Sequence, residues 1–459
     1  HGLKIQRAAE EKGLDPKKFC DELSKTFRNL SKTLNLSNTD FIRTTEDRHI
    51  KSVQNLWKIL EKKNQIYLSK YSGWYSVSDE AFYSDNEIKE ENGINISTIS
   101  GSKVEWVEEE SYFFKLSKWQ DKLLEFYERN ENFILPISRK NEVLSFVKGG
   151  LKDLSISRKS FSWGIKVPNN ENHVIYVWLD ALTNYLSALK YPDEKNILYK
   201  NFWPASLHII GKDILRFHAV YWPAFLLAAD IKPPLRVYGH GWILSGEEKM
   251  SKSKGNILDP LEIISKYGLD QLRYYLIKEV SLGNDGNIST ENIVNCINND
   301  LANNFGNFVQ RTIAFAEKNC ENKIPLKDKF NTKDKEVLNL FSDLKKIRLL
   351  IDNQKLNDYI KFIVDCSFNS NKYFNDEAPW SQKKNLDRMN SIVYVSLELI
   401  RKISILLLPI IPETATKALK SLNVDVKKIS FETLNNHETL ISGQKLNNQG
   451  ILFKKVETK

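Results

Sequence analysis

Apolar residues recur at steps of three and four in two stretches near the start of the chain. The first begins after Asp15, a candidate N-cap, and Pro16, which suits a first helical position. Its apolar members are Phe19, Cys20, Leu23, Phe27, Leu30 and Leu34. The second comprises Ile50, Val53, Leu56, Trp57 and Leu60. Each spacing predicts one amphipathic helix.

The pattern of apolar residues changes after residue 66. Between Tyr67 and Trp106 the apolar residues come in short aromatic or β-branched stretches, separated by Gly73, Gly93 and Gly101. Such stretches with glycine breaks are typical of short strands joined by turns. The pattern predicts a small β-rich insertion.

Strand-like and helix-like segments alternate from residue 174 onward. Residues 174–180 ("VIYVWLD"), 206–211 ("SLHIIG") and 235–244 ("LRVYGHGWIL") are predicted as buried strands. Residues 213–229 ("DILRFHAVYWPAFLLAA") form a nearly all-apolar stretch of helical length. This alternation favours an α/β fold with a doubly wound parallel sheet, whose faces need apolar helices.

Beyond about residue 287 the strand signals fade. Three stretches show apolar stripes at helical spacing with lysine-rich opposite faces: 336–351, 358–374 and 391–407. The mostly polar residues 323–335 predict a loop or an irregular crossover. The last third is therefore predicted as a separate helix bundle.

The amino-acid composition indicates the class of protein. The 459 residues suffice for two or three domains, and 41% hydrophobic with 27% charged residues is typical of a soluble globular protein. The longest apolar run, residues 403–412, is too short for a membrane span and contains proline. The chain opens with His1 in a charged, helix-like segment, so we expect a fragment that lacks its N-terminus.

Cysteine spacing and net charge bear on the cellular compartment and on the kind of binding partner. The four cysteines, at 20, 296, 320 and 366, form no CxxC pair, which suits a reducing compartment such as the cytoplasm or an organellar matrix. A net charge of +9 favours a polyanionic partner. A chain rich in lysine and asparagine for compositional reasons would show the same charge, so both interpretations stay open.

The most distinctive polar stretch is "GEEKMSKSKGN", residues 246–256. It places Lys249 and Lys252 three residues apart, with the Ser251 hydroxyl between them. Ammonium groups on flexible stems suit a triphosphate that must later leave as pyrophosphate. A solvated surface loop is the competing interpretation, and lysine content alone favours it.

Two further segments could border a binding site. In "HIIGKDILRFH", Gly211 would let a nucleotide approach the end of a strand, and Asp213 could accept hydrogen bonds from ribose hydroxyls. His208 and His218 read as core or surface histidines on composition alone. In "VWLDALTNY", Trp178, Ala181 and Tyr185 form a helically spaced row that could line a pocket wall, although the spacing alone favours core packing.

Residues 41–49 ("FIRTTEDRH") and 301–311 ("LANNFGNFVQR") are specific-looking polar stretches whose spacing indicates no role. Together with "KMSKS", "YGHGWIL", "IGKDILRFHAVYWPAFL", "VWLDALTNY" and "NKYFNDEAPW", they resemble the class I aminoacyl-tRNA synthetases, and among these the methionyl-tRNA synthetases of bacterial and organellar type. The resemblance covers essentially the whole chain, and its motifs are specific in combination.

The resemblance implies an architecture: a Rossmann-like parallel-sheet catalytic domain with a small inserted connective domain, followed by an α-helical bundle. In this sequence the parts are expected as follows: catalytic 1–66 and 151–240, connective insertion 67–150, lysine loop and stem-contact region 241–290, and anticodon-binding domain 291–459.

The resemblance also implies site residues. Lys252, supported by Lys249, would stabilise the phosphates of ATP. The other ATP-binding residues would be Gly211, Asp213, His240, Gly241, Trp242, Ile243 and Ser251. The methionine pocket would consist of Trp178, Ala181, Leu182, Tyr185, Ile214, Phe217 and His218, with Leu182 standing where many relatives have proline. Asn371 would belong to the helix face that reads the CAU anticodon.

The sequence departs from the family pattern in three places. The phosphate-binding HIGH-type signature and its strand would precede His1, so the fragment is expected to be inactive by itself. The insertion shows "YSGWYSVSDEAFY" (71–83), where zinc-bearing relatives place cysteines, so no structural zinc is expected. No tryptophan for anticodon stacking is evident around residues 422–428.

The function implied is ATP-dependent ligation of L-methionine to its tRNA through methionyl-adenylate, for translation initiation and elongation. ATP with Mg²⁺, methionine and methionine tRNA are the expected ligands, with a monomer and no membrane partner. A leucine or valine enzyme would need a large editing insertion, and a cysteine enzyme would need zinc ligands. A non-catalytic tRNA-binding relative is the alternative outside enzymes, and the intact "KMSKS" argues against it.

Overall fold

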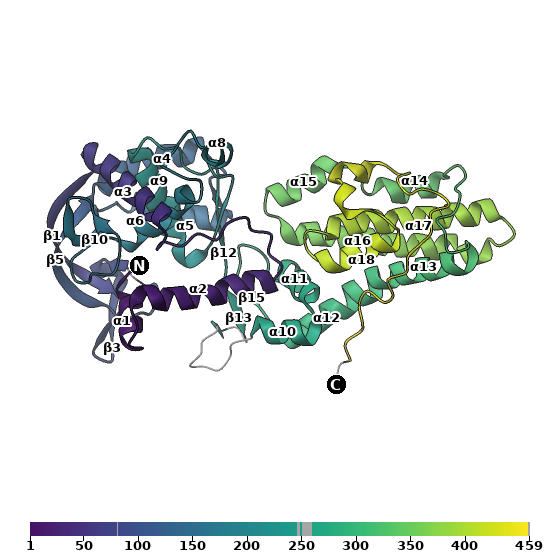
Figure 1. Cartoon of the computed structure of the whole chain (residues 1–459), viewed down its shortest axis with the longest axis horizontal. Helices are drawn as coiled ribbons and strands as arrows, with labels where there is room; N and C mark the ends of the chain where they lie inside the picture. Colours follow the sequence, from purple (N-terminus) through teal and green to yellow (C-terminus); the bar gives the residue numbers. More distant parts are fainter. Residues whose placement is uncertain (80, 246–247, 250–258, 458–459) are drawn as a thin grey trace. The chain divides into compact units, whose positions relative to one another are not determined.

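The computed structural model describes residues 1–79, 81–245, 248–249 and 259–457. The chain divides into two compact units, His1–His240 and Gly241–Lys459 (Figure 1). The first combines helices with several small sheets, and the second is mostly helical. The predicted combination of an α/β part and a helix bundle is confirmed. Among the described residues, none of the helices is long and apolar enough to span a membrane.

Three helices open the first unit: α1 (Leu3–Glu10), α2 (Pro16–Thr33) and α3 (Asp47–Lys62). The predicted cap is present, because the Asp15 carboxylate accepts the backbone N–H groups of the second and third residues after it. The apolar stripes of α2 and α3 differ in how far they are buried. That of α3 is buried, whereas Leu23 and Phe27 on α2 are 41% and 61% exposed.

The predicted β-rich insertion is present. Strands β1 (Ile66–Ser76), β2 (Ala81–Tyr83), β3 (Ile88–Glu91), β4 (Ile94–Ser97) and β5 (Glu105–Phe114) are all antiparallel. The turn between β3 and β4 is Asn92–Gly93, both with positive φ, as a tight hairpin requires. Nearby, Asp79 accepts hydrogen bonds from the hydroxyls of Tyr83, Ser100 and Ser102, a polar cluster that holds the β1–β2 turn against the β4–β5 loop.

The next segment corrects one predicted strand. Strand β10 (Asn170–Ile175) ends before Tyr176, and helix α6 (Val177–Leu182) takes up the rest of residues 174–180. β10 also pairs antiparallel with β8 (Ser157–Arg158) and β9 (Lys166–Val167), outside the parallel sheet. A short apolar run fits a buried strand and a buried helix equally well, so periodicity could not place this boundary.

The other elements of this segment are helices and two short strands. They are α4 (Gln120–Arg129), β6 (Ile134–Leu135), α5 (Ile137–Lys148), β7 (Leu154–Ser155), α7 (Asn184–Ser187) and α8 (Ile197–Phe202).

The first unit also contains a small parallel sheet. Its order is β11 (His208–Gly211), β12 (Val237–His240) and β6. The crossover from β11 to β12 is the predicted apolar helical segment, which includes a π-helical stretch, Phe217–Tyr221, and α9 (Trp222–Ala228). Both ends of this crossover are anchored in the main hydrophobic core, which fixes the carboxyl end of β11 and the amino end of β12.

The predicted strand 235–244 is also divided. β12 ends at His240, and β13 (Ile243–Ser245) belongs to the second unit, where it pairs with β14 (Glu248–Lys249) and β15 (Gly286–Asn287). Gly241 lies at the break. A Cβ there would meet the carbonyl oxygen of Asn284 at 2.1 Å, so only glycine allows this close backbone contact.

The rest of the second unit is helical, as predicted for the last third of the chain. α17 (Leu386–Leu407) is its centre, buried along nearly its whole length. The other helices are α10 (Pro260–Tyr267), α11 (Leu269–Lys278), α12 (Thr290–Cys296) with the π-helical Ile297–Gly306, α13 (Asn307–Asn319), α14 (Thr332–Asn339), α15 (Leu344–Asp352), α16 (Leu356–Glu377) and α18 (Pro412–Ser421). The loop predicted at 323–335 is shorter than expected, because α14 begins at Thr332 and takes up its last four residues.

Candidate active site

The carboxyl ends of β11 and β12 bring three predicted nucleotide-binding residues together. Gly211 pairs with His240 across the two parallel strands. The Asp213 carboxylate follows in the first turn after β11, where it is exposed to solvent. A Cβ on Gly211 would lie 2.5 Å from Asp213 Oδ1, so a larger residue would displace the carboxylate. This edge of a parallel sheet is where α/β proteins bind nucleotides.

An aromatic wall lies on two elements of the same unit. Trp178 on α6 and Phe217 on the π-helical stretch stack with ring centroids 3.8 Å apart and an interplanar angle of 8°. Ala181 and Ile214 are both partly exposed on the same two segments. Leu182, by contrast, is completely buried in the hydrophobic core, so it supports the wall from behind.

A polar chain crosses this wall. The Tyr185 hydroxyl donates to His218 Nε2 at 2.8 Å, and His218 Nδ1 donates to the Ile214 carbonyl at 3.0 Å. These two bonds define the neutral tautomer of His218, with its proton on Nδ1. Burial lowers the pKa of His218 to about 4, so the ring is uncharged at neutral pH.

His208 is a further member that the sequence did not identify. Its ring stacks on Tyr185 at 3.8 Å with an interplanar angle of 20°. Burial, with a smaller effect from His218, lowers the pKa of His208 to about 3. Its position at the start of a predicted buried strand was the only available signal. The wall is therefore aromatic and uncharged, with one hydroxyl and two neutral imidazoles.

The other predicted ATP-binding residues belong to the second unit or lie outside the described residues. The backbone N–H of Trp242 donates to Asp285 Oδ1 at 2.8 Å. Ile243, whose side chain is 38% exposed, pairs with Gly286 between strands β13 and β15. The backbone of Lys249 pairs with Leu244 in the β13–β14 hairpin. Ser251 and Lys252 lie outside the described residues, so their placement stays a prediction.

Asn371 lies in an asparagine-rich surface pocket of about 490 Å³ in the second unit. Its side-chain amide donates to Asn304 and to the Ser367 carbonyl. Arg311 lines the same pocket and donates to Asn375 Oδ1 at 2.7 Å. The structure therefore brings the stretch 301–311, which had no role on spacing, to the helix that carries Asn371.

An exposed tryptophan lies next to Arg311. Trp380 is 43% exposed, follows α16 in "NKYFNDEAPW", and has the Arg311 guanidinium 5.9 Å from its ring centroid. Trp380 lies outside residues 422–428, where a stacking tryptophan was expected, and its role stays a prediction.

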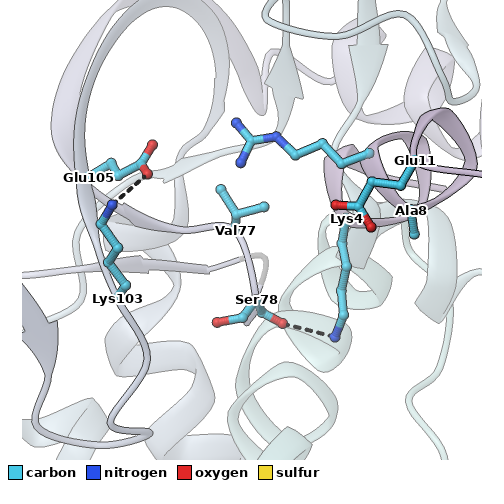
Figure 2. A pocket seen from close by; sticks show the side chains of 8 residues that line it. Lys4, Ala8, Glu11, Val77, Ser78, Lys103 and Glu105 are labelled. Carbon is cyan, nitrogen blue, oxygen red and sulfur yellow. Dashed lines mark hydrogen bonds and ion pairs between the residues drawn. The ribbon is translucent and has the colours of Figure 1, made fainter.

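A different pocket, of about 340 Å³, lies between α1 and the insertion (Figure 2). Lys4 donates to the Ser78 carbonyl at 3.3 Å, and Lys103 pairs with Glu105 at 3.4 Å. The predicted site residues contribute nothing to its lining. Among the described residues, no group of three histidine, cysteine or acidic side chains is placed to hold a metal ion.

Comparisons with known proteins agree with this geometry. The family described as tRNA synthetases class I (M) matches residues 1–95 and 91–313, and the anticodon-binding domain of methionyl tRNA ligase matches residues 342–459. The methionine–tRNA ligase of Rickettsia conorii is 48% identical over all of this chain and 90% of its own length. That of Brucella suis is 48% identical over 94% of this chain and 84% of its own length.

Solved structures give the same result. The Mycobacterium tuberculosis methionyl-tRNA synthetase in complex with methionyl-adenylate superposes with a TM-score of 0.96, at 42% identity, covering 99% of this chain and 90% of that one. Its free form superposes with a TM-score of 0.90 at 39% identity, covering 96% and 88%. The resemblance inferred from the motifs is thus confirmed: the chain belongs to the methionyl-tRNA synthetase family of class I aminoacyl-tRNA synthetases.

Proposed function

We propose that the protein ligates L-methionine to its tRNA in two steps. The methionine carboxylate attacks the α-phosphate of ATP, forming methionyl-adenylate and releasing pyrophosphate. A ribose hydroxyl at the tRNA 3′ end then attacks the acyl carbon, giving methionyl-tRNA and AMP. The observation that carries the proposal is the stacking of Trp178 on α6 against Phe217 on the π-helical stretch. Tyr185 follows on α7, and the Asp213 carboxylate lies just after Gly211, ahead of the π-helical stretch.

The wall suits the side chain of methionine. A thioether gains about 0.3–1.5 kcal/mol from each favourable contact with an aromatic ring, and its unbranched chain fits a narrow slot. Trp178, Tyr185 and Phe217 supply the rings. His218 is held neutral by Tyr185 and the Ile214 carbonyl, so no charge opposes an apolar ligand. Ala181 leaves room beside the indole.

ATP would bind at the strand edge, with Asp213 accepting from the ribose hydroxyls and Gly211 and His240 lining the approach. Gly241, Trp242 and Ile243 would border the adenine. Lys249, Ser251 and Lys252 would hold the phosphates as charge develops on them, which is the main electrostatic requirement of the first step. ATP would enter as its Mg²⁺ complex, the cation bound by the phosphates.

The second unit would read the anticodon. Asn371, Asn304 and Arg311 offer amide and guanidinium groups for unpaired bases, and Trp380 offers an exposed ring on which a base could stack. These roles, and a monomeric state, are parts of the proposal.

ATP–pyrophosphate exchange with each of the twenty amino acids tests the function. The full-length protein should exchange with methionine alone. Tyr185→Ala should raise the KM for methionine and leave that for ATP unchanged, because it removes a ring of the methionine wall. Tyr185→Phe is the matched control that keeps the ring. Exchange with another amino acid, or equal loss of affinity for both substrates in Tyr185→Ala, would refute the assignment.

A further inference from the structure

His49 ends the polar stretch 41–49, whose spacing indicated no role. It lies in the first turn of α3 and is completely buried. Its Nε2 is 2.7 Å from Asp180 Oδ1, and its Nδ1 is 3.0 Å from the Ser187 hydroxyl. One imidazole therefore bonds α6, through Asp180, and α7, through Ser187.

Asp180 is an unusual residue for this position, because it is a carboxyl group only 1% exposed inside the first turn of a helix. A buried carboxylate is costly unless hydrogen bonds compensate it. Its second oxygen is 2.5 Å from His1 Nδ1, so two imidazoles hold it from opposite oxygens. Asp180 is consequently tied to one orientation, and α6 with it.

The residues on either side of Asp180 belong to the aromatic wall proposed to bind methionine. Trp178 precedes it by two positions and Ala181 follows directly, while Tyr185 lies between the two contacts of His49 along the chain. α3 also binds the end of this segment, because Asn55 donates to the Tyr191 hydroxyl at 3.0 Å. α3 and α6 lie side by side in the first unit (Figure 1).

We propose that His49 is a positioning residue for the methionine pocket. It acts through Asp180, whose hydrogen bond sets where α6 presents Trp178 and Ala181. The inference rests on the proposed function, since it concerns the affinity for methionine. It assigns to His49 no contact with substrate.

Two substitutions separate the contacts of the ring. A glutamine amide reaches the position of imidazole Nε2, so His49→Gln keeps a donor for Asp180. An asparagine amide reaches the position of Nδ1, so His49→Asn keeps the partner of Ser187 and loses Asp180. Methionine and ATP KM values from pyrophosphate exchange, with thermal unfolding of each variant, are the measurements. Ser187→Ala is the control: it removes the Nδ1 contact and the hydroxyl's bond to the Thr183 carbonyl, but leaves the contact between His49 and Asp180 in place.

His49→Asn should raise the methionine KM by about tenfold or more, because small misplacements of binding groups are amplified in affinity and rate. His49→Gln and Ser187→Ala should stay within about twofold of the parent protein in both KM values, and the ATP KM should be unchanged throughout. Equal methionine KM values in His49→Asn and His49→Gln would overturn the positioning role.

Asp180→Glu provides a second test in case His49→Asn unfolds. It keeps the charge and moves the carboxylate by one methylene, so it should also raise the methionine KM selectively; an unchanged value overturns the inference. The full-length parent protein, in which all variants are made, separates failure of the proposed function from failure of the His49 role. If the full-length protein shows no methionine-dependent exchange, the proposed function fails and the role of His49 fails with it.

Discussion

The two buried imidazoles of the aromatic wall should make the first unit sensitive to acid. His208 and His218 are each 3% exposed, and burial lowers their pKa values to about 3 and about 4. In the unfolded chain each pKa returns to about 6.5. Between these values the unfolded chain binds more protons than the folded one. Their contribution to stability is therefore complete above about pH 6.5 and is lost as the pH falls toward 4 and 3.

The magnitude follows from these pKa values. Going from pH 7 to pH 5 should cost about 2 kcal/mol of unfolding free energy for each imidazole, hence about 4 kcal/mol for the pair. His208→Phe removes one of the two groups and keeps a ring stacked on Tyr185. It also removes Nε2, a buried nitrogen that has no hydrogen-bond partner among the described atoms. The variant should therefore lose only about 2 kcal/mol over the same interval and be no less stable at pH 7.

Urea unfolding at pH 7, 6 and 5, followed by tryptophan emission and extrapolated to water, measures the difference. Eight of the ten tryptophans lie within residues 1–240, so the signal reports mainly on the first unit. His437→Gln, in the second unit, is the control and should leave this pH dependence unchanged. An identical loss between pH 7 and pH 5 in His208→Phe and the parent protein would refute the reasoning.

Three further outcomes are expected. Lys252→Ala should slow pyrophosphate exchange about a hundredfold, or about 3 kcal/mol, without weakening methionine binding, and unchanged exchange would contradict its role. Trp380→Ala should raise the KM for tRNA about tenfold in aminoacylation, because stacking on one base contributes about 1–3 kcal/mol. Trp380→Phe should have a KM for tRNA close to that of the parent protein. Pyrophosphate exchange should not change in either variant. Glu87→Gln breaks the 2.9 Å ion pair between Arg216 and Glu87 and should lower the unfolding free energy by only about 0.5–1 kcal/mol in urea titrations, because both side chains are partly exposed; a loss above about 2 kcal/mol would show a larger role.

Local patterns determined much of what the sequence could predict. The cap at Asp15, the stripe of α3 and the long bundle helices depend on residues within a few positions of one another, so periodicity and capping identify them. The motif resemblance likewise placed the chain in its family from residues contiguous in sequence, and it named Trp178 and Phe217, whose rings stack in the structure.

Tertiary structure decided what depends on distant partners. An apolar run can be strand or helix until its neighbours are known, so the boundary at Tyr176 and the division at Gly241 could not be predicted. The sequence also could not predict which apolar stripe is buried, since that of α2 stays partly exposed. His49 meets Asp180 across 131 residues, a contact that no spacing encodes. Periodicity reports which face of an element is apolar, whereas the partner of that face is chosen only when the whole chain packs.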